Sequence, residues 1–426
     1  MTDAAASQAG GAGEVAGAGG QADAASQAAE GQASRLRLIL ILGALSAFAP
    51  LSIDMYLPAL PAMARGLHAS TSAAQLTLTA CMVGLAAGQL LAGPVSDARG
   101  RRPPLLIGVG AYAAASALCI VAPAVWLLIG LRLLQGLAGA AGIVIARAVV
   151  RDVFSGDETA RIYAYLMVVN GVAPIAAPII GAQLLRLTDW RGIFAVLALI
   201  GVVLFAVAAR WLPESLPPAR RRPGGLAPIL QDARILVADP RFTRIALASG
   251  LAFGVMFAYI SGSSFVLQTK FGISPQLFSL IFAINGTGIV LVSQISGRLA
   301  GRVPQAALFA GGLYGSAAGG VLVLITALTG AGLPLLLPGL FVLTASIGLV
   351  LPNGTALAMA THGERAGSAA GLTGTAQFAI GGGAAPIVGV AGPGTALPMG
   401  IVMSTLGVSA LLMRPRSRSR SAVVAG

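Results

Sequence analysis

The stretch that decides the fold is Gly93-Pro-Val-Ser-Asp97-Ala-Arg99-Gly100-Arg101-Arg102-Pro103, a charged segment between two long apolar runs. Charged side chains are expensive in hydrocarbon, so this density of charge predicts a turn at a membrane surface. Each flanking run is long enough for a transmembrane helix, because about 20 apolar residues cross about 30 Å of hydrocarbon. The segment therefore predicts a membrane protein in which the chain crosses the bilayer on both sides of this turn.

The composition indicates a polytopic membrane protein. Mean hydropathy is +0.86 and only 10% of the 426 residues are charged, whereas a soluble domain carries about 25%. The formal net charge is +13, but the basic residues are scattered between apolar runs. That distribution fits loops held near anionic lipid rather than a nucleic-acid groove. We expect the lipid bilayer as a partner and no nucleic acid.

Breaks at charges, prolines and glycines divide the chain into twelve predicted spans. They lie at roughly 36–58, 73–95, 103–122, 125–149, 161–186, 191–211, 242–263, 276–297, 305–328, 331–356, 366–390 and 393–413. If both termini are cytoplasmic, 22 of the 27 basic residues fall in cytoplasmic segments. Only Arg65, Arg186, Arg191 and Lys270 fall outside, which satisfies the positive-inside rule. We therefore expect a multi-pass protein of the bacterial cytoplasmic (inner) membrane.

The predicted fold is an all-α membrane protein with twelve transmembrane helices in two pseudo-symmetric six-helix bundles. The expected parts are a disordered tail 1–34, an N-terminal bundle 35–211, a cytoplasmic linker 212–241, a C-terminal bundle 242–413 and a basic tail 414–426. The tail 1–34 lacks the charged and apolar regions of a signal peptide.

Two short matches indicate a duplicated six-helix unit. Ala177-Pro-Ile-Ile-Gly181 recurs as Ala385-Pro-Ile-Val-Gly389 at an offset of 208, and Gly93 corresponds to Gly297 at an offset of 204. Because six is even, the two copies share an orientation in the membrane. Chance similarity of Gly/Pro motifs is the alternative.

One acidic residue lies deep in a predicted span. Counting about 1.5 Å per residue from Arg37 places Asp54 about 25 Å along the first helix. Pro50 and Pro58 precede and follow it and permit bending. An ionisable group at that depth usually faces a cavity or a partner, so Asp54 is the predicted proton-coupling and substrate-binding residue. The alternative is that Asp54 caps the outer end of the helix.

Arg132 is the only basic residue well inside a span, and it could balance Asp54. The alternative is an arginine that extends to the outer interface. Cys81 and Cys119 lie in apolar runs without metal or redox spacing and are expected to be small buried residues. We expect no metal and no cofactor.

The opening segment also suggests a gate. Gly93 and Gly100 allow close packing, and Asp97 could pair with Arg147 or Arg151 at the inner end of the fourth span. Pro178 and Gly181 give the fifth span a kink and a small surface. A loop that only sets the topology is the alternative interpretation of the segment.

Several polar or aromatic residues lie inside spans, and some should line a cavity while others join helices. They are Gln89, Asn170, Tyr259, Asn285, Asn353 and Gln377. Of these, Asn170, Tyr259, Asn285 and Gln377 are the predicted substrate contacts, together with Asp54.

The chain resembles the major facilitator superfamily, and within it the twelve-span drug:proton antiporters of the Bcr/CflA subfamily, which export bicyclomycin and chloramphenicol. The resemblance spans about 36–413. It rests on the segment 93–103, Arg132 with Gln135-Gly136, and the Gly/Pro stretch from Asn170 to Ala182. The subfamily resemblance rests on Asp54-Met-Tyr-Leu-Pro-Ala-Leu-Pro61, Ala146-Arg-Ala-Val-Val-Arg151-Asp152, Trp190-Arg191 with Phe194, and Gly374-Thr-Ala-Gln377-Phe378.

The resemblance implies a central cavity, alternating access, and proton-driven efflux coupled through Asp54 and Arg132. It places Asp97, Arg101 and Arg102 in the cytoplasmic gate, which we extend to Gly93, Arg99, Gly100, Arg147, Arg151, Pro178 and Gly181. Three positions depart from the family pattern. Ala98 replaces a common Arg, the second-half counterpart Gly297–Arg302 lacks the Asp, and Ser46 stands where some relatives carry a second acid.

The predicted function is proton-coupled export of drugs or other small, largely apolar compounds by a monomer. A transporter of an endogenous metabolite is the alternative. An enzyme or a channel is disfavoured, because the chain has two His, no deep carboxylate pair and no filter sequence.

Overall fold

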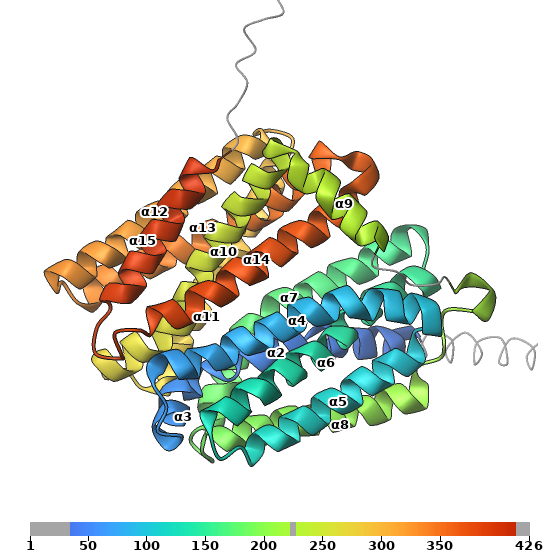
Figure 1. Ribbon diagram of the computed structural model, residues 1–426, viewed down its shortest axis with the longest axis horizontal. Helices are drawn as coiled ribbons and strands as arrows, with labels where there is room; N and C mark the ends of the chain where they lie inside the picture. The colour runs from blue at the N-terminus through green and yellow to red at the C-terminus, as the bar shows by residue number, and fades with distance from the viewer. Residues whose placement is uncertain (1–34, 222–226, 415–426) are drawn as a thin grey trace, which may run out of the picture.

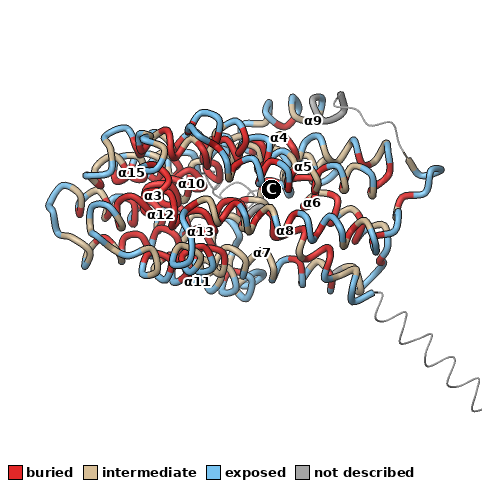
Figure 2. The backbone as a smooth tube through the Cα atoms, turned by 90° about the horizontal axis from the view of Figure 1, so that it is seen from below, coloured by how far each residue is buried: buried red, intermediate tan, exposed pale blue. Residues whose placement is uncertain are grey.

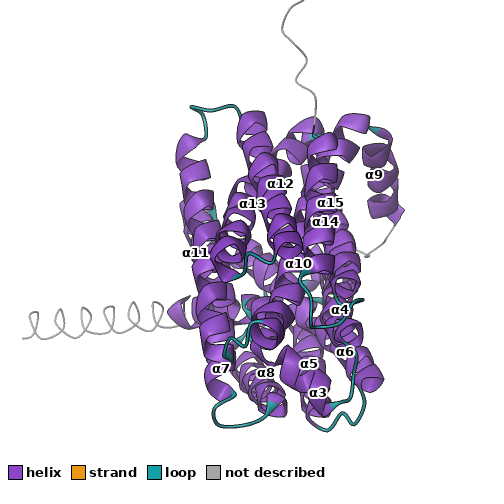
Figure 3. Cartoon of the chain, turned by 90° about the vertical axis from the view of Figure 1, so that its left-hand side faces the viewer, coloured by secondary structure: helices purple, strands orange, loops and turns teal. Residues whose placement is uncertain are grey.

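The computed structural model describes residues 35–221 and 227–414, and nearly all of this chain is helical (Figure 1; Figure 3). The predicted tail 1–34, the C-terminal tail after Arg414, and Arg222 in the linker lie outside the described residues. The helices of the N-terminal half are Arg35–Ser46, α2 (Phe48–Asp54), η1 (Leu57–Ala59), α3 (Leu60–Gly66), α4 (Thr71–Arg99), α5 (Arg102–Ile120), α6 (Val125–Val153), α7 (Gly156–Leu184) and α8 (Trp190–Trp211).

The rest of the described chain comprises a linker and six longer helices. The linker holds η2 (Pro218–Arg220) and α9 (Ala227–Ala238). The C-terminal half holds α10 (Pro240–Phe265), η3 (Val266–Lys270), α11 (Pro275–Leu299), α12 (Gln305–Thr329), α13 (Leu333–Thr361), η4 (Gly363–Arg365), α14 (Ala366–Val388) and α15 (Leu397–Leu412).

The helix bounds agree with twelve spans. In the described residues, nine helices are long and apolar enough to cross a membrane, and Arg35–Ser46 with Pro50–Gly66 adds a tenth, bent by 41°. The remaining two predicted spans coincide with α14, which has 23 residues, and with α15, a shorter apolar helix of 16 residues. Large apolar residues such as Ile107, Leu199 and Leu328 are exposed, and Figure 2 shows exposed residues along the outer helices. Such exposure is expected where lipid replaces water.

The charged segment 93–103 is less of a turn than the sequence predicts. Helix α4 has 29 residues and continues to Arg99, so most of the segment is helical. At 1.5 Å per residue α4 is about 44 Å long, which carries its last turns beyond the hydrocarbon into the headgroup region. The reversal of direction occurs at Gly100, whose φ of 92° favours glycine. The prediction of a turn over the whole segment was therefore wrong: Asp97 and Arg99 lie in the last turn of α4, Arg101 follows Gly100, and Arg102 begins α5.

The two halves pack against each other in a two-fold arrangement. Helix α4, in the second predicted span, packs against α14 in the eleventh, and α7, in the fifth, packs against α11 in the eighth. In a duplicated six-helix unit the second span corresponds to the eighth and the fifth to the eleventh. The α4–α14 contact therefore has its equivalent in the α11–α7 contact. In Figure 1 the N-terminal bundle is drawn in blue and green, and the C-terminal bundle in yellow, orange and red.

Glycines allow the helices within each half to approach closely. A Cβ atom at Gly136 of α6 would overlap the carbonyl oxygen of Cys81 on α4. In the second half, Gly348 of α13 meets the carbonyl of Ile289 on α11 in the same way. In lipid, such small-residue contacts are a main source of helix association, because the hydrophobic effect does not drive it.

We expect Gly136→Ala to lower the free energy of unfolding by about 1–3 kcal/mol, because the new methyl group would force α4 and α6 apart. The matched control is Gly130→Ala in the same helix, where a Cβ would meet nothing within 4 Å. That control should leave stability unchanged or raise it by up to about 1 kcal/mol. Thermal unfolding of both purified variants in detergent checks the difference, and equal stabilities would contradict the packing.

Candidate substrate and proton site

Asp54 lies at a break in the first span. Helix α2 ends at Asp54, two non-helical residues follow, and η1 begins at Leu57. Asp54 is only 7% exposed. Among the described residues its carboxyl group has no hydrogen-bond donor and no cation within ion-pair distance. Such an isolated buried carboxyl is rare, and it marks a functional site more often than a structural one.

The opposite half contributes polar groups close to this carboxyl. Tyr259 of α10 lies within electrostatic range of Asp54. Its hydroxyl oxygen accepts a hydrogen bond from Nδ2 of Asn285 on α11 at 2.8 Å, and both side chains are buried. Asp54, Tyr259 and Asn285 are thus gathered from both halves into one region.

The other polar residues predicted inside spans, of which Asn170 and Gln377 were predicted substrate contacts, are less clearly placed. The amide of Asn170 donates to the carbonyl of Leu166 in its own helix at 2.8 Å. Gln377 is half-buried on α14. Asn353 joins two helices, because its Nδ2 donates to Oγ of Ser296 at 2.7 Å. Gln89 is half-buried in the second half of α4.

Arg132 is fully buried and belongs to a closed ring of hydrogen bonds. Its guanidinium donates to Oε1 of Gln135 and, at 2.7 Å, to the main-chain carbonyl of Ser52. Gln135 donates to Ser116, Ser116 donates to the carbonyl of Tyr112, and the hydroxyls of Tyr112 and Ser52 lie 2.8 Å apart. The ring links α2, α5 and α6 through a buried cation.

The structure corrects two expectations about Arg132. The guanidinium is 0% exposed, so it does not extend to the membrane interface. It also forms no ion pair with Asp54; its contact with the first span is the Ser52 carbonyl, two residues earlier. The rings of Tyr56 and Phe194 lie 5.1 and 5.7 Å from the guanidinium carbon and add cation–π attraction. Arg132 therefore positions the backbone near Asp54, and it does not bond the carboxyl group of Asp54.

Helix α7 also contacts the break. A Cβ at Gly181 would overlap the carbonyl oxygen of Met55, directly after Asp54. Pro174 and Pro178 lie inside the same helix and each removes a main-chain donor. The predicted kink region of the fifth span thus touches the predicted proton site.

A charged cluster occupies the end of the N-terminal bundle that carries Gly100, which we call the Gly100 end. Arg101 is 3% exposed; its Nε donates to Asp152 of α6 at 2.7 Å, and its guanidinium also donates to Asp97 and Ser96. Burial opposes the charge of Arg101, but the hydrogen bonds and negative charges of Asp152 and Asp97 outweigh it and raise its pKa.

Glu214 completes this cluster and was missed by sequence reasoning. Its carboxylate accepts from the main-chain N–H groups of Arg101 at 2.8 Å, Arg102 at 3.1 Å and Leu216 at 3.0 Å. Partial burial opposes its charge, but these donors outweigh that effect and lower the pKa of Glu214. The available signal was its place directly after the sixth span, opposite the charged segment.

The predicted partners of Asp97 were wrong for this state of the molecule. Arg147 and Arg151 are exposed, and in the described residues neither forms an ion pair with Asp97. The predicted segment itself supplies the partner, Arg101. Arg102 instead donates to the carbonyl of Ala209 at 2.6 Å, and Arg99 is exposed. Gly93 has open space beside it, because a Cβ added there would meet a single side-chain atom, at 4.0 Å.

Hydrogen bonds between the two halves lie at the opposite end, which carries Gly66 and Thr71 and which we call the Gly66 end. Within the described residues, five side-chain bonds join the halves: Ser72 to Pro386, Gln75 to Ser261, Thr79 to Gly382, Ser264 to Leu57, and Gln276 to Ala182. Thr79 is about 12 Å along α4 from its start, so the bonded zone covers only the Gly66 end.

Comparison with known proteins identifies the family. The family model described as "Major Facilitator Superfamily" matches residues 42–386 of this chain. The chain belongs to the Major Facilitator Superfamily. A solved structure of the nucleoside transporter NupG shares the fold, with a TM-score of 0.70 at 14% identity over 90% of this chain and 100% of that one.

Three relatives indicate the subfamily of this superfamily member. The chain is 41% identical to the uncharacterized MFS-type transporter YdgK of Bacillus subtilis, over 87% of this chain and 92% of the relative. It is 30% identical to a bicyclomycin resistance protein homolog of Haemophilus influenzae (89% and 96%). It is 34% identical to a chloramphenicol resistance protein of Pseudomonas aeruginosa (74% and 75%). The predicted resemblance to the Bcr/CflA subfamily of this superfamily is confirmed.

For this superfamily member we expect Arg132→Lys to lower the free energy of unfolding by about 1.5–3 kcal/mol, because an ammonium group cannot bond Gln135 and Ser52 with the same fork. The matched control is Arg186→Lys, at an exposed arginine. Chemical unfolding in detergent measures both. Equal stability of the two variants would show that the ring needs only a positive charge.

A second prediction concerns acid stability. Because the pKa of Glu214 is lowered from its ordinary value of 4.5, its stabilising contribution is present above that value and is lost as the pH falls through the folded-state pKa. Glu214→Gln should therefore destabilise the transporter at pH 7 and lose this effect at acid pH. Unfolding midpoints at several pH values check this, with the exposed Glu364→Gln as control. A pH-independent difference would contradict it.

Proposed function

We propose that this chain exports drugs or other small, largely apolar compounds across the cytoplasmic membrane in exchange for protons. The observation that carries the proposal is the isolated carboxyl group of Asp54, buried at a break in the first span and close to groups of the opposite half. The relatives named for bicyclomycin and chloramphenicol resistance support drugs as the substrate class.

Asp54 is suited to carry the proton. Burying an ionised carboxylate without a partner costs several kcal/mol, so the neutral acid fits the state described above. Opening of the site would expose the group to water, where the carboxylate is favoured and the proton is released. A proton that binds on one side and leaves on the other couples the gradient to the movement of the two halves.

The distribution of contacts supports alternating access. All five side-chain hydrogen bonds between the halves in the described residues lie at the Gly66 end. At the Gly100 end, the ion pairs of Arg101 stay within the N-terminal half. We infer that units 35–211 and 242–413 rock about the linker 212–241, and that this state is closed at the Gly66 end.

We assign the Gly100 end to the cytoplasm, with both termini on that side. The support is the excess of arginine in the segments that fall there, because basic loops are retained in the cytoplasm. We also propose that the transporter acts as a monomer, since each half supplies part of the site around Asp54.

The central test of this function replaces Asp54 by Asn, which keeps the size of the side chain and removes the exchangeable proton. The wild type should raise the inhibitory concentration of at least one compound of a drug panel in a pump-deficient bacterium. The uncoupler-sensitive part of that increase should be lost in Asp54→Asn at equal membrane expression. The matched control is the exposed Asp157→Asn, which should behave like the wild type.

Two results would overturn the proposal. Full resistance in Asp54→Asn would remove the proton role from this residue. No shift for any compound with the wild type would favour export of an endogenous metabolite instead. Reconstituted vesicles with an imposed pH gradient separate these outcomes, because they report proton movement directly.

A further inference from the structure

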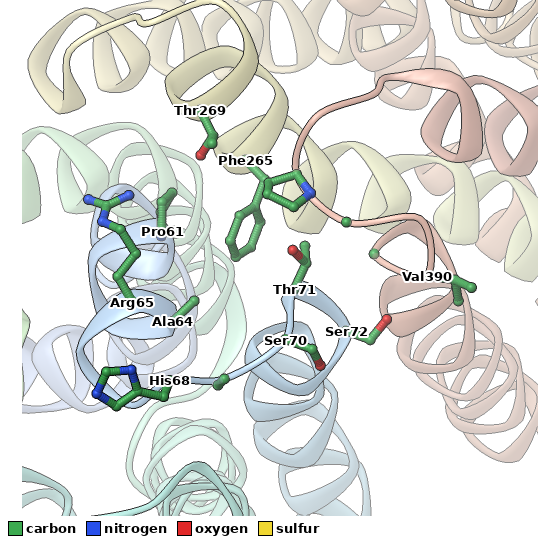
Figure 4. A pocket seen from close by; sticks show the side chains of 14 residues that line it. Pro61, Ala64, Arg65, His68, Ser70, Thr71, Ser72, Phe265, Thr269 and Val390 are labelled. Carbon is green, nitrogen blue, oxygen red and sulfur yellow. The ribbon is translucent and has the colours of Figure 1, made fainter.

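A row of polar side chains on α4 faces the opposite half. Ser72, Gln75 and Thr79 are spaced by three and four residues, which places them on one face of the helix. Helix α4 packs against α14, and all three side chains donate hydrogen bonds to main-chain carbonyls of α14 or α10. Figure 4 shows Ser72 at the start of α4, with its side chain on the side of Val390, just after α14.

The hydrogen bond of Thr79 has an acceptor that a regular helix does not offer. Its hydroxyl donates to the carbonyl of Gly382 at 2.8 Å. Inside a helix that carbonyl accepts from the N–H group four residues later, but this residue is Pro386, which has no N–H. Pro386 therefore leaves the carbonyl of Gly382 without its usual partner, and a side chain of the opposite half takes that place.

The helices are close enough at this point to exclude other partners. A Cβ atom at Gly382 would lie 3.5 Å from Cγ2 of Thr79, so α4 passes directly over this turn of α14. Near the end of α14, a Cβ at Gly389 would overlap Oε1 of Gln75. Gly382 is buried. A carbonyl left unpaired here would be costly, because burial removes it from water.

The hydrogen bond of Ser72 lies in a different environment. Ser72 lines a pocket of about 670 Å³ at the Gly66 end, between the two halves, whereas Thr79 does not. Thr79 lies seven residues further along α4, about 10 Å deeper. The acceptor of Ser72 is the carbonyl of Pro386, which also accepts from the N–H of Gly389 at 3.3 Å. Loss of the Ser72 hydroxyl therefore leaves its acceptor with another donor.

The equivalent contact between α7 and α11 lacks the donor. In the repeated sequence Pro178 corresponds to Pro386, and the offset of 204 places Ala283 of α11 where α4 has Thr79. The methyl group of Ala283 cannot donate a hydrogen bond. A proline-freed carbonyl with a hydroxyl opposite it is therefore a feature of the α4–α14 contact.

We propose that Pro386 is a positioning residue of the gate at the Gly66 end, and that Thr79 is its partner. While this end is closed, Thr79 satisfies the carbonyl that Pro386 frees at Gly382. When the halves separate, water takes the place of Thr79. The hydrogen bond thus favours the closed state, and its contribution depends on Pro386. The consequence for export rests on the proposed function, whereas the effect on the two states does not.

A double-mutant cycle tests this dependence. Spin labels at Leu187→Cys and Leu328→Cys, two exposed positions on opposite halves, report in nanodiscs how often the Gly66 end is closed. The native Cys81 and Cys119 are buried. Pulsed electron resonance then gives the ratio of closed to open molecules. Thr79→Val should lower that ratio about two- to tenfold, because the closed state would bury an unpaired carbonyl.

In a Pro386→Ala background, Thr79→Val should change the ratio by less than about twofold. The reason is that the restored N–H group bonds the Gly382 carbonyl within α14 in both states. An equal effect of Thr79→Val in the two backgrounds would overturn the proposal.

Single variants keep the proposal testable if Pro386→Ala does not fold. Thr79→Ser keeps the hydroxyl and should retain the wild-type ratio. Ser72→Ala should lower the ratio by a smaller factor than Thr79→Val, because the N–H of Gly389 still bonds its acceptor. The matched control Thr375→Val removes an exposed hydroxyl that bonds within α14, and it should behave like the wild type. The proposal fails if Thr79→Ser lowers the ratio as much as Thr79→Val.

Export gives a separate measurement in reconstituted vesicles. With the Gly100 end in the cytoplasm, Thr79→Val leaves fewer molecules open to the cytoplasm. It should therefore raise the drug concentration for half-maximal export, whereas Thr79→Ser should not. If the wild type exports no compound, the proposed function fails, and the label distances still decide the role of Pro386.

Discussion

The buried guanidinium of Arg132 is the interaction on which the site depends. A cation removed from water and lipid must have its donors satisfied, because a buried charge left without partners costs several kcal/mol. Among the described residues no carboxylate serves as its partner; Gln135 and the main chain at Ser52 accept from its two terminal nitrogens, and Nε has no hydrogen-bond partner. The cation thereby fixes the backbone two residues before Asp54. The acid has no fixed partner in the part of the chain that the structure describes, which leaves its carboxyl group available to a proton.

Close helix contacts make this arrangement rigid. Gly136 follows Gln135 by one residue and brings α6 against Cys81 of α4, while Gly181 brings α7 against Met55. The carbonyl oxygens at these contacts leave no room for a side chain. The break that carries Asp54 is therefore held from two sides, by the Arg132 ring and by α7. The polar chemistry and the packing of small residues act on the same few residues of the first span.

The sequence was sufficient for the spans but not for the partners within them. Runs of about 20 apolar residues with basic segments between them are a direct consequence of bilayer thickness, so the twelve predicted spans coincide with helices. The partner of Arg101 depends on which face α6 turns toward α4, and the sequence does not fix that rotation. Arg101 therefore pairs with Asp97 in place of Arg147 or Arg151, and Asp152 is the residue of α6 that joins this pair. Glu214 was not predicted, because its hydrogen-bond donors are main-chain N–H groups, which have no sequence signature.

The two halves differ in how their Gly100 ends are held. In the first half, Arg101 binds Asp97 and Asp152 inside the bundle. The second-half counterpart Gly297–Arg302 lacks the acid. Elsewhere in that half, at the start of α14, Asp232 of the linker helix α9 accepts from Arg365 at 2.9 Å and from Ser368 at 2.6 Å, and these bonds lower its pKa. The ion pairs of Arg101 thus lie within the first half, and the ion pair of Arg365 joins the second half to the linker. In the described residues these ion pairs do not cross between the halves, so the proposed separation of the Gly100 ends would break none of them. The proposed opening of the Gly66 end would instead break the hydrogen bonds between the halves.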